Sequence, residues 1–325
     1  MAAEPRASIV LLCYRDAAYI RDALNGALAQ TVPCEIIVSN DASDDGTCEI
    51  ALELIAGYDG PHHVSLRRNA RNLGVAAHVN AVVPLARCEI VVMMAGDDIA
   101  HPERVAALLQ AFEASPQTMI VGSDVEGIDH DGRPRGGGTR SHPSRFGLDY
   151  YVRAGRLVSL LGASLAFRRV VFDRFGPLRG PIEDNALSLR GALLGDCVFL
   201  PQPLLRYRRH AGSVSSGVFA RDEPPAVAFR RRYQRTTAFY RGTADDLAHC
   251  LSQLPELAQP KRVAAEHIIA MYRIEADARE AILERPRREW LGPILRGLRQ
   301  PGLRRKSAER ALKLLLPRRW FGLRS

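Results

Sequence analysis

The sequence of 325 residues lacks several features that mark other classes of protein. Its six cysteines are scattered, with no C-x-x-C pair and no cluster with histidine, which argues against a zinc site or a dense disulfide framework. No apolar run approaches the roughly 20 residues that cross a bilayer. The first apolar run is too short for a signal peptide. We therefore expect a cytoplasmic protein in a reducing compartment, with any membrane attachment peripheral, on the inner face of the membrane.

The positive charge is unevenly distributed along the chain. The formal net charge is +9, although residues 1–225 hold 23 basic against 26 acidic side chains. Residues 226–325 hold 22 basic against 10 acidic side chains, a net charge of +12. The larger part of the chain is thus nearly neutral, and the C-terminal region carries the excess of base.

Short apolar runs alternate with helical patterns over the first hundred residues. Runs that are apolar on both faces, separated by helices of about 10 to 15 residues, predict βαβ units and a parallel sheet. The expected strands cover residues 8–14, 34–41, 62–68 and 88–98, and the expected helices cover residues 19–30, 46–57 and 74–86. The following stretch to about residue 217 mixes strands and helices, and the chain becomes helical in pattern after about residue 225. The pattern predicts an α/β fold.

Polar side chains end three of these strands. Tyr14, Asp41 and the pair Asp97 and Asp98 each lie at the C-terminal end of an expected strand, where parallel sheets bind their ligands. Each has an ordinary alternative: a tyrosine at the rim, an Asx turn, and a cap for the next helix. Together they favour a ligand site, with Tyr14 stacking on a base and Asp41 accepting a ring N–H. The adjacent acids suit a hard cation bound to a diphosphate.

Four stretches resemble the family-2 glycosyltransferases, which are inverting enzymes of the GT-A fold. They are SIVLLCYRDAAYIRDALNGALAQT, EIIVSNDASDDGT, NLGVAAHVNAVV and VVMMAGDDIAHPERV. The resemblance covers about residues 7–217 and is strongest in the first 110. It implies a GT-A domain with a mostly parallel sheet at 1–225, followed by a helical, basic region at 226–325. Within that domain we expect a nucleotide-sugar half at about 1–110 and an acceptor half at about 111–225.

The resemblance also implies a donor and a metal ion. The donor is a nucleotide-diphospho-sugar, with UDP favoured; Tyr14 packs on its base and Asp41 reads it. Asp97 and Asp98 correspond to the D-x-D element, which contacts the ribose and holds Mn²⁺ or Mg²⁺. The commonest form of this element, D-A-D-D, has an acid where this chain has Ala95. The division of labour between Asp97 and Asp98 therefore stays open.

Two further stretches complete the implied site. In the stretch GPIEDNALSLRG the resemblance makes Asp184 the base that takes the proton of the acceptor hydroxyl, and Glu183 precedes it. In YRRHAGSVS it implies that His210 contacts the metal or the diphosphate and that Arg208 neutralises phosphate. The alternatives are a helix cap formed by Glu183 and Asp184, and a structural histidine.

The sequence therefore predicts an inverting, metal-dependent glycosyltransferase acting in cell-envelope polysaccharide or glycolipid synthesis. One alternative is a catalytically inactive module of the same fold that binds a nucleotide-sugar or a partner, which Ala95 permits. Another is a nucleotidyltransferase, but its first loop would be rich in glycine and basic residues, and LLCYRDAAYI is not.

The region 286–325 interleaves leucine and tryptophan with arginine and lysine. Such a composition suits an anionic membrane surface that presents a lipid-linked or other sugar acceptor. A helical cap with a solvated basic face explains it equally well. No nucleic-acid recognition module accompanies the charge, so we expect no nucleic-acid partner.

Overall fold

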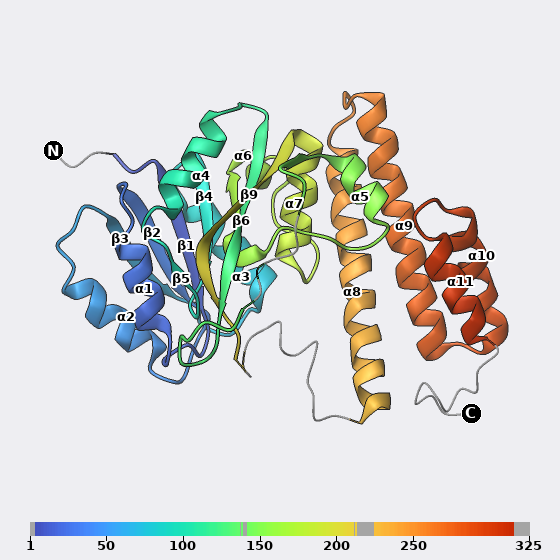
Figure 1. Cartoon of the computed structure of the whole chain (residues 1–325), viewed down its shortest axis with the longest axis horizontal. Coiled ribbons are helices and arrows are strands. Elements are labelled where there is room, and N and C mark those ends of the chain that lie inside the picture. The colour runs from blue at the N-terminus through green and yellow to red at the C-terminus, as the bar shows by residue number, and fades with distance from the viewer. Residues whose placement is uncertain (1–3, 137, 139–141, 211, 213–223, 315–325) are drawn as a thin grey trace. The chain divides into compact units, whose positions relative to one another are not determined.

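The computed structural model describes residues 4–136, 138, 142–210, 212 and 224–314 (Figure 1). The chain divides into two compact units. The first comprises residues 1–147, 159–178 and 183–210, and the second comprises residues 148–158, 179–182 and 211–325. Two short segments from the middle of the chain thus belong to the second unit. The predicted domains, 1–225 and 226–325, stay a prediction, because compactness does not show which parts fold independently.

The first half of the sheet is parallel, as predicted. Its strand order is β3-β2-β1-β4, and each neighbouring pair runs parallel. Strands and helices alternate along the chain: β1 (Ala7–Cys13), α1 (Ile20–Leu28), β2 (Cys34–Asn40), α2 (Thr47–Ala56), β3 (His63–Arg68), α3 (Val75–Val82), the 3-10 turn η1 (Val83–Leu85) and β4 (Ile90–Ala95). β1 and β2 are buried almost throughout because helices cover both faces of this half, which explains their continuous apolar runs.

The second half of the sheet is mixed. A short strand, β8, runs antiparallel between β4 and β6, while β6 pairs parallel with β9. β5 and β7 pair antiparallel with β9. The bounds are β5 (Ile99–Ala100), α4 (Arg104–Glu113), β6 (Thr118–Ile128), β7 (Arg145–Phe146), η2 (Gly162–Ser164), β8 (Ala166–Arg168), α6 (Val170–Asp173), α7 (Glu183–Leu194) and β9 (Asp196–Arg208). The predicted α/β class is confirmed, and its parallel character is strongest before residue 100.

The pairing of β5 with β9 positions the motifs found in the sequence. Ile99 lies opposite Arg206, and Ala100 lies opposite Leu205. Because the two strands are antiparallel, the residues before Ile99 lie beside those after Arg206. The acid pair at the end of β4 therefore meets the end of β9, which is more than a hundred residues away in sequence.

The second unit is helical. It contains α5 (Leu148–Ala154), α8 (Pro225–Ser252), α9 (Gln259–Glu284), the turn η4 (Arg287–Trp290), α10 (Leu291–Arg299) and α11 (Arg304–Lys313). α8 and α9 pack side by side as two long helices (Figure 1). The inserted segment is tied to them, since Tyr272 Oη donates to the carbonyl of Arg156 (3.2 Å) and the amide of Leu157 donates to Tyr240 Oη (3.3 Å). Among the described residues, none of the helices combines the length and the apolar character that a membrane span requires.

Candidate active site

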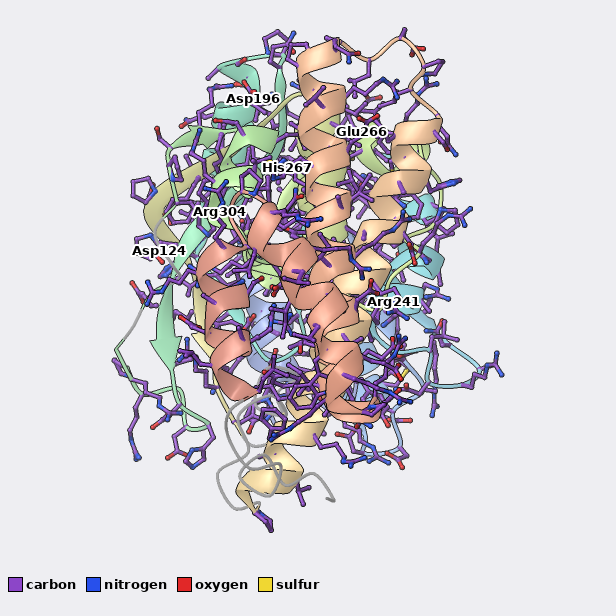
Figure 2. The ribbon with its side chains drawn as sticks, turned by 90° about the vertical axis from the view of Figure 1, so that its right-hand side faces the viewer. Asp124, Asp196, Arg241, Glu266, His267 and Arg304 are labelled. Atoms are coloured by element: carbon purple, nitrogen blue, oxygen red, sulfur yellow. The ribbon has the colours of Figure 1, made fainter. Side chains whose placement is uncertain are left out.

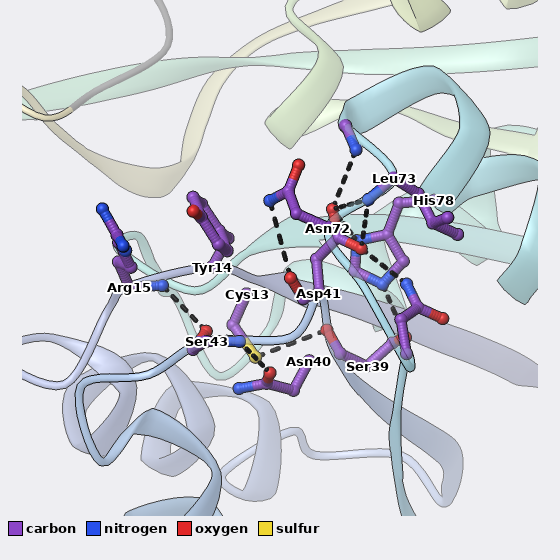
Figure 3. Close-up of polar contacts among 12 residues, drawn as sticks. Cys13, Tyr14, Arg15, Ser39, Asn40, Asp41, Ser43, Asn72, Leu73 and His78 are labelled. Atoms are coloured by element: carbon purple, nitrogen blue, oxygen red, sulfur yellow. Dashed lines mark hydrogen bonds and ion pairs between the residues drawn. The ribbon is translucent and has the colours of Figure 1, made fainter.

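Two loops at the carboxyl ends of β1 and β2 hold Tyr14 at the surface (Figure 3). The Asn40 side chain accepts the amide of Ser43 (2.8 Å) and so closes the loop that follows β2. The guanidinium of Arg15 pairs with both oxygens of Asp44 at 2.8 Å. Arg15 also lies 5.4 Å from the centre of the Tyr14 ring, which is 42% exposed. The ring is thus available for stacking.

Asp41 directly follows β2 and is buried, and its carboxylate faces the N-terminal end of α3 (Figure 3). Its carboxylate accepts the amides of Leu73 and Gly74, each at 3.0 Å, and the side-chain amide of Asn69 at 2.6 Å. The N-terminus of a helix favours such a negative charge. The structure therefore places Asp41 near Tyr14, at the ends of neighbouring strands, but its oxygens already accept protein N–H groups.

A histidine that the sequence did not single out supports Asp41. His78 Nε2 lies 2.6 Å from Ser39 Oγ, and its Nδ1 lies 4.0 Å from the Asp41 carboxylate. Burial is the main cause that lowers the pKa of His78, to about 4; the charge of Arg67 also lowers it, while Asp41 opposes both. His78 is therefore neutral at pH 7. Its position on the buried face of a helical pattern was the only signal in the sequence.

The adjacent acids Asp97 and Asp98 lie in opposite environments. Asp98 is fully buried, and its Oδ1 accepts the backbone amide of Arg208 at 2.8 Å. Its Oδ2 has no hydrogen-bond partner among the described residues. Burial, and then the charge of Asp97, raise the pKa of Asp98 well above its usual range. The Asp97 side chain is 17% exposed, and its Oδ2 lies 3.0 Å from Nε2 of His210. Of the three predicted metal ligands, the structure thus brings Asp97 and His210 together and turns Asp98 inward.

Arg208 is buried and donates hydrogen bonds to several segments of this region. Its guanidinium donates to the carbonyl of Asp97 (2.8 Å), to the carbonyl of His130 (3.1 Å) and to the carboxylate of Asp22 (3.1 Å). The side chain is 2% exposed and lies 4.8 Å from the ring of Tyr19. In this arrangement the Arg208 guanidinium holds the backbone carbonyls of Asp97 and His130 and is not directed at a phosphate group. A phosphate would have to displace these bonds, so the predicted contact with the donor stays a prediction.

Asp16 is a site residue that the sequence analysis missed. Burial, and then the charge of Asp97, raise its pKa to about 7, while His210 opposes them. The Asp16 side chain packs closely against the backbone of Gly96. This packing requires glycine, because a Cβ at position 96 would lie 2.6 Å from Asp16 Oδ2 and 2.6 Å from the Cβ of Cys13. No pattern in the sequence indicates this contact between Asp16 and Gly96, because Asp16 is simply a residue that precedes a helix.

A second group of possible metal ligands follows β6. Asp129, His130 and Asp131 each offer a ligand atom, and these atoms lie within 4.8 Å of one another. Asp129 already accepts the amides of Asp131 (3.0 Å) and Arg133 (2.9 Å), which closes a turn. Arg208 binds the carbonyls of Asp129 and His130, so one side chain holds both this turn and Asp97. The sequence analysis did not identify this group.

The predicted base lies at the start of α7. Asp184 Oδ2 accepts the hydroxyl of Ser159 (2.9 Å), and its Oδ1 accepts the amide (2.6 Å) and the side-chain amide (2.8 Å) of Asn185. Burial is the main cause that raises the pKa of Asp184. Burial, and then the charge of Asp184, raise the pKa of Glu183 to about 8. A Cβ at Gly162 would lie 2.8 Å from Glu183 Oε1, so the turn before β8 passes directly over the pair.

Comparisons with known proteins agree on one family. An uncharacterized protein of Mycobacterium tuberculosis is 30% identical over 216 residues, which are 64% of this chain and 60% of that protein's length. A glycosyltransferase of Nostoc is 25% identical over 225 residues, 63% of this chain and 65% of the relative. The chain thus spans less than two thirds of the length of these relatives.

Two solved structures share the fold. Staphylococcus aureus TarS in complex with UDP-GlcNAc is superposed with a TM-score of 0.59 at 16% identity, over 95% of this chain and 90% of that one. The mannosyltransferase PcManGT of Pyrobaculum calidifontis, in complex with GDP-Man and Mn²⁺, gives a TM-score of 0.54 at 17% identity, over 98% of this chain and 84% of that one. The predicted GT-A fold is confirmed. Because the sequence model described as "Glycosyl transferase family 2" also matches residues 8–176, the chain belongs to glycosyltransferase family 2.

Proposed function

We propose that this protein transfers a sugar from a nucleotide-diphospho-sugar to an acceptor hydroxyl with inversion at the anomeric carbon. The observation that carries the proposal is the environment of Asp184. Its carboxylate is oriented by Ser159 and Asn185, and its pKa is raised by burial. A general base works best when its pKa is closer to the working pH than that of an ordinary aspartate.

The donor end of the proposed site is formed by Tyr14 and Asp41. The exposed Tyr14 ring would stack on the base, and the fixed Asp41 carboxylate would accept a ring N–H. TarS binds UDP-GlcNAc and PcManGT binds GDP-Man, and both structures share this fold. We favour UDP as the nucleotide, as the sequence analysis did.

The residues present fit a divalent metal ion. Asp97 offers a partly exposed carboxylate in contact with the imidazole of His210, and carboxylate oxygens are the ligands that Mg²⁺ and Mn²⁺ prefer. We therefore place Mn²⁺ or Mg²⁺ on Asp97 and His210, with Asp98 supporting the turn from the interior. The ion would neutralise the charge of the leaving diphosphate.

The chain's own groups then handle the proton. Asp184 would take the proton of the acceptor hydroxyl as the new bond forms at the anomeric carbon and the bond to the diphosphate breaks. Glu183, with a pKa of about 8, is protonated at neutral pH and adds no second negative charge beside Asp184. Ser159 and Asn185 keep the carboxylate of Asp184 in one orientation.

We place the acceptor in cell-envelope polysaccharide or glycolipid synthesis, at the cytoplasmic face of the membrane. The basic C-terminal region supports this proposal, because it adds positive charge to a protein whose substrate would lie at an anionic surface.

Calorimetric titration tests the donor and metal assignments together. UDP, GDP and dTDP are added to the full chain with and without Mn²⁺, and the titrations are repeated on Asp97→Asn and Asp184→Asn. We expect one nucleotide to bind with the help of the metal, Asp97→Asn to lose that help, and Asp184→Asn to bind like the unaltered protein. Nucleotide binding without transfer to any offered acceptor would instead favour the catalytically inactive module. No binding of any nucleotide would contradict the proposal.

A further inference from the structure

One face of α10 exposes a row of three leucines. Leu291, Leu295 and Leu298 are exposed by 47, 50 and 36%. Their spacing of four and then three residues puts them along one line of the helix, and we call this row the leucine stripe. Among the described residues seven other large apolar side chains are exposed, and each lies on a different element or loop. Scattered apolar side chains are ordinary, whereas three on one helix face indicate a contact surface.

The leucine stripe is not a core face that failed to pack, because α10 has a separate core face. Pro293, Ile294 and Gly297 are buried on it. A Cβ at Gly297 would lie 2.1 Å from Ser307 Oγ, so α10 and α11 approach closely on that side. Trp290, just before α10, is buried and donates its indole N–H to the carbonyl of Arg285 (3.0 Å). The helix is thus fixed from one side and presents the leucine stripe on the other.

Positive charge surrounds the leucine stripe. Residues 286–314 hold nine basic side chains and two acidic ones, a net charge of +7. Arg288 precedes Leu291 by three residues and Arg299 follows Leu295 by four, so both border the stripe. Both are exposed, and neither pairs with an acid within the part of the chain that the structure describes. Arg304 begins α11 beside this helix (Figure 2).

We propose that the leucine stripe, with Arg288 and Arg299, docks on an anionic membrane surface. An amphipathic helix lying in the interface buries its apolar row at the boundary of the acyl chains, while arginines at its edge reach the lipid phosphates. A nucleic acid would engage the arginines and leave the leucines in water. The charge of +7 and the apolar row together therefore favour lipid. This docking does not depend on the proposed transfer reaction.

Vesicle sedimentation with the full chain tests the docking. The protein is mixed with vesicles of phosphatidylcholine alone or of equal parts phosphatidylcholine and phosphatidylglycerol, at low and at raised salt. We expect binding to the anionic vesicles only, weakened by salt. Changing the stripe to serine should lower the partition coefficient at least about tenfold, and each loss of an arginine should lower it about fivefold. The stripe variant is Leu291→Ser, Leu295→Ser and Leu298→Ser, and the arginine variant is Arg288→Gln and Arg299→Gln.

A control variant carries the same chemical change elsewhere. Leu52, Leu85 and Val263 are exposed by 58, 50 and 52%, and each becomes serine in it. We expect its vesicle binding to equal that of the unaltered chain, and we expect the circular dichroism spectrum and thermal unfolding to be unchanged in all variants, which shows that they fold.

Four results would overturn the docking proposal. They are no binding to anionic vesicles, binding that survives in the stripe variant, an equal loss in the control variant, and binding to a DNA duplex in place of vesicles. Sedimentation velocity without lipid tests whether the leucine stripe instead binds a second copy of this chain. A dimer that disappears in the stripe variant would assign the stripe to a second copy of this chain. Each of these results leaves the donor-binding measurements, and so the proposed transfer reaction, to be judged separately.

Discussion

Glu275 in the helical unit and Glu183 in the first unit differ in the charged side chains that surround them. Glu275 on α9 is fully buried, and although burial acts to raise its pKa, the hydrogen bonds and charges of Arg310, Arg279 and Lys306 lower it to about 2. Near the start of α7, burial and the charge of Asp184 raise the pKa of Glu183 to about 8. Glu275 is surrounded by cations, whereas Glu183 has no ion pair within the part of the chain that the structure describes. Burial alone therefore does not identify a functional acid; the absence of a neutralising cation is the better guide.

Replacing the predicted base, Asp184, should have the largest effect. Asp184→Asn keeps the size of the side chain and one acceptor oxygen for Asn185, and its NH2 group can donate to Ser159 Oγ, but it removes the basic carboxylate. We expect transfer to fall about 10²- to 10⁴-fold, with donor binding and thermal stability nearly unchanged. Initial rates with a donor and an acceptor measure transfer, titration calorimetry measures donor binding, and scanning calorimetry measures thermal stability. Full activity in this variant would remove Asp184 from the mechanism.

Replacing Glu275 should instead lower the stability of the fold. Glu275→Gln leaves Arg279, Lys306 and Arg310 buried or half-buried around a neutral group. Removing one member of a buried ion cluster costs about 3–5 kcal/mol of folding free energy. Denaturant unfolding measures the loss, and Glu266→Gln on the exposed side of the same helix is the control (Figure 2). If Glu275→Gln were as stable as that control, the cation cluster would not be what holds α9 and α11 together.

The two candidate metal positions can be separated by matched changes. Asp97→Asn should weaken metal-dependent nucleotide binding about 10- to 100-fold, because it removes the accessible carboxylate beside His210. Asp131→Asn should change it little, since the Asp129 turn closes through backbone amides that this change leaves in place. Titration of the nucleotide at several Mn²⁺ concentrations measures both. The reverse pattern would move the metal to the turn after β6.

The pH dependence of stability should have opposite signs for the two acids. Glu275 has its pKa lowered from 4.5 to about 2, so its contribution is present above pH 4.5 and is lost as the pH falls toward 2. Glu183 has its pKa raised from 4.5 to about 8, so its contribution is present below pH 4.5 and is lost as the pH rises toward 8.

Unfolding free energies across that range, compared among the unaltered chain, Glu275→Gln and Glu183→Gln, measure both slopes. We expect Glu275→Gln to flatten the acid side of the curve and Glu183→Gln to flatten the neutral side. Equal slopes in all three proteins would show that neither acid is shifted as described.

Patterns in the sequence were enough to predict the alternation of strands and helices, the α/β class and the family. Apolar periodicity reports which faces are buried, and a strand end marks where a polar side chain can reach a ligand. For this reason Tyr14, Asp41 and Asp97 could be singled out from local pattern, whereas Asp184 was singled out through the family resemblance.

The difference between the two adjacent acids, in contrast, follows from the pairing of distant strands. Asp97 and Asp98 are equivalent in the sequence, but the antiparallel pairing of β5 with β9 brings the amide of Arg208 to Asp98 and the ring of His210 to Asp97. The same pairing brings Arg208 to backbone carbonyls that no local pattern connects to it. Contacts between residues more than a hundred positions apart depend on strand pairing and register, and local periodicity carries no information about either.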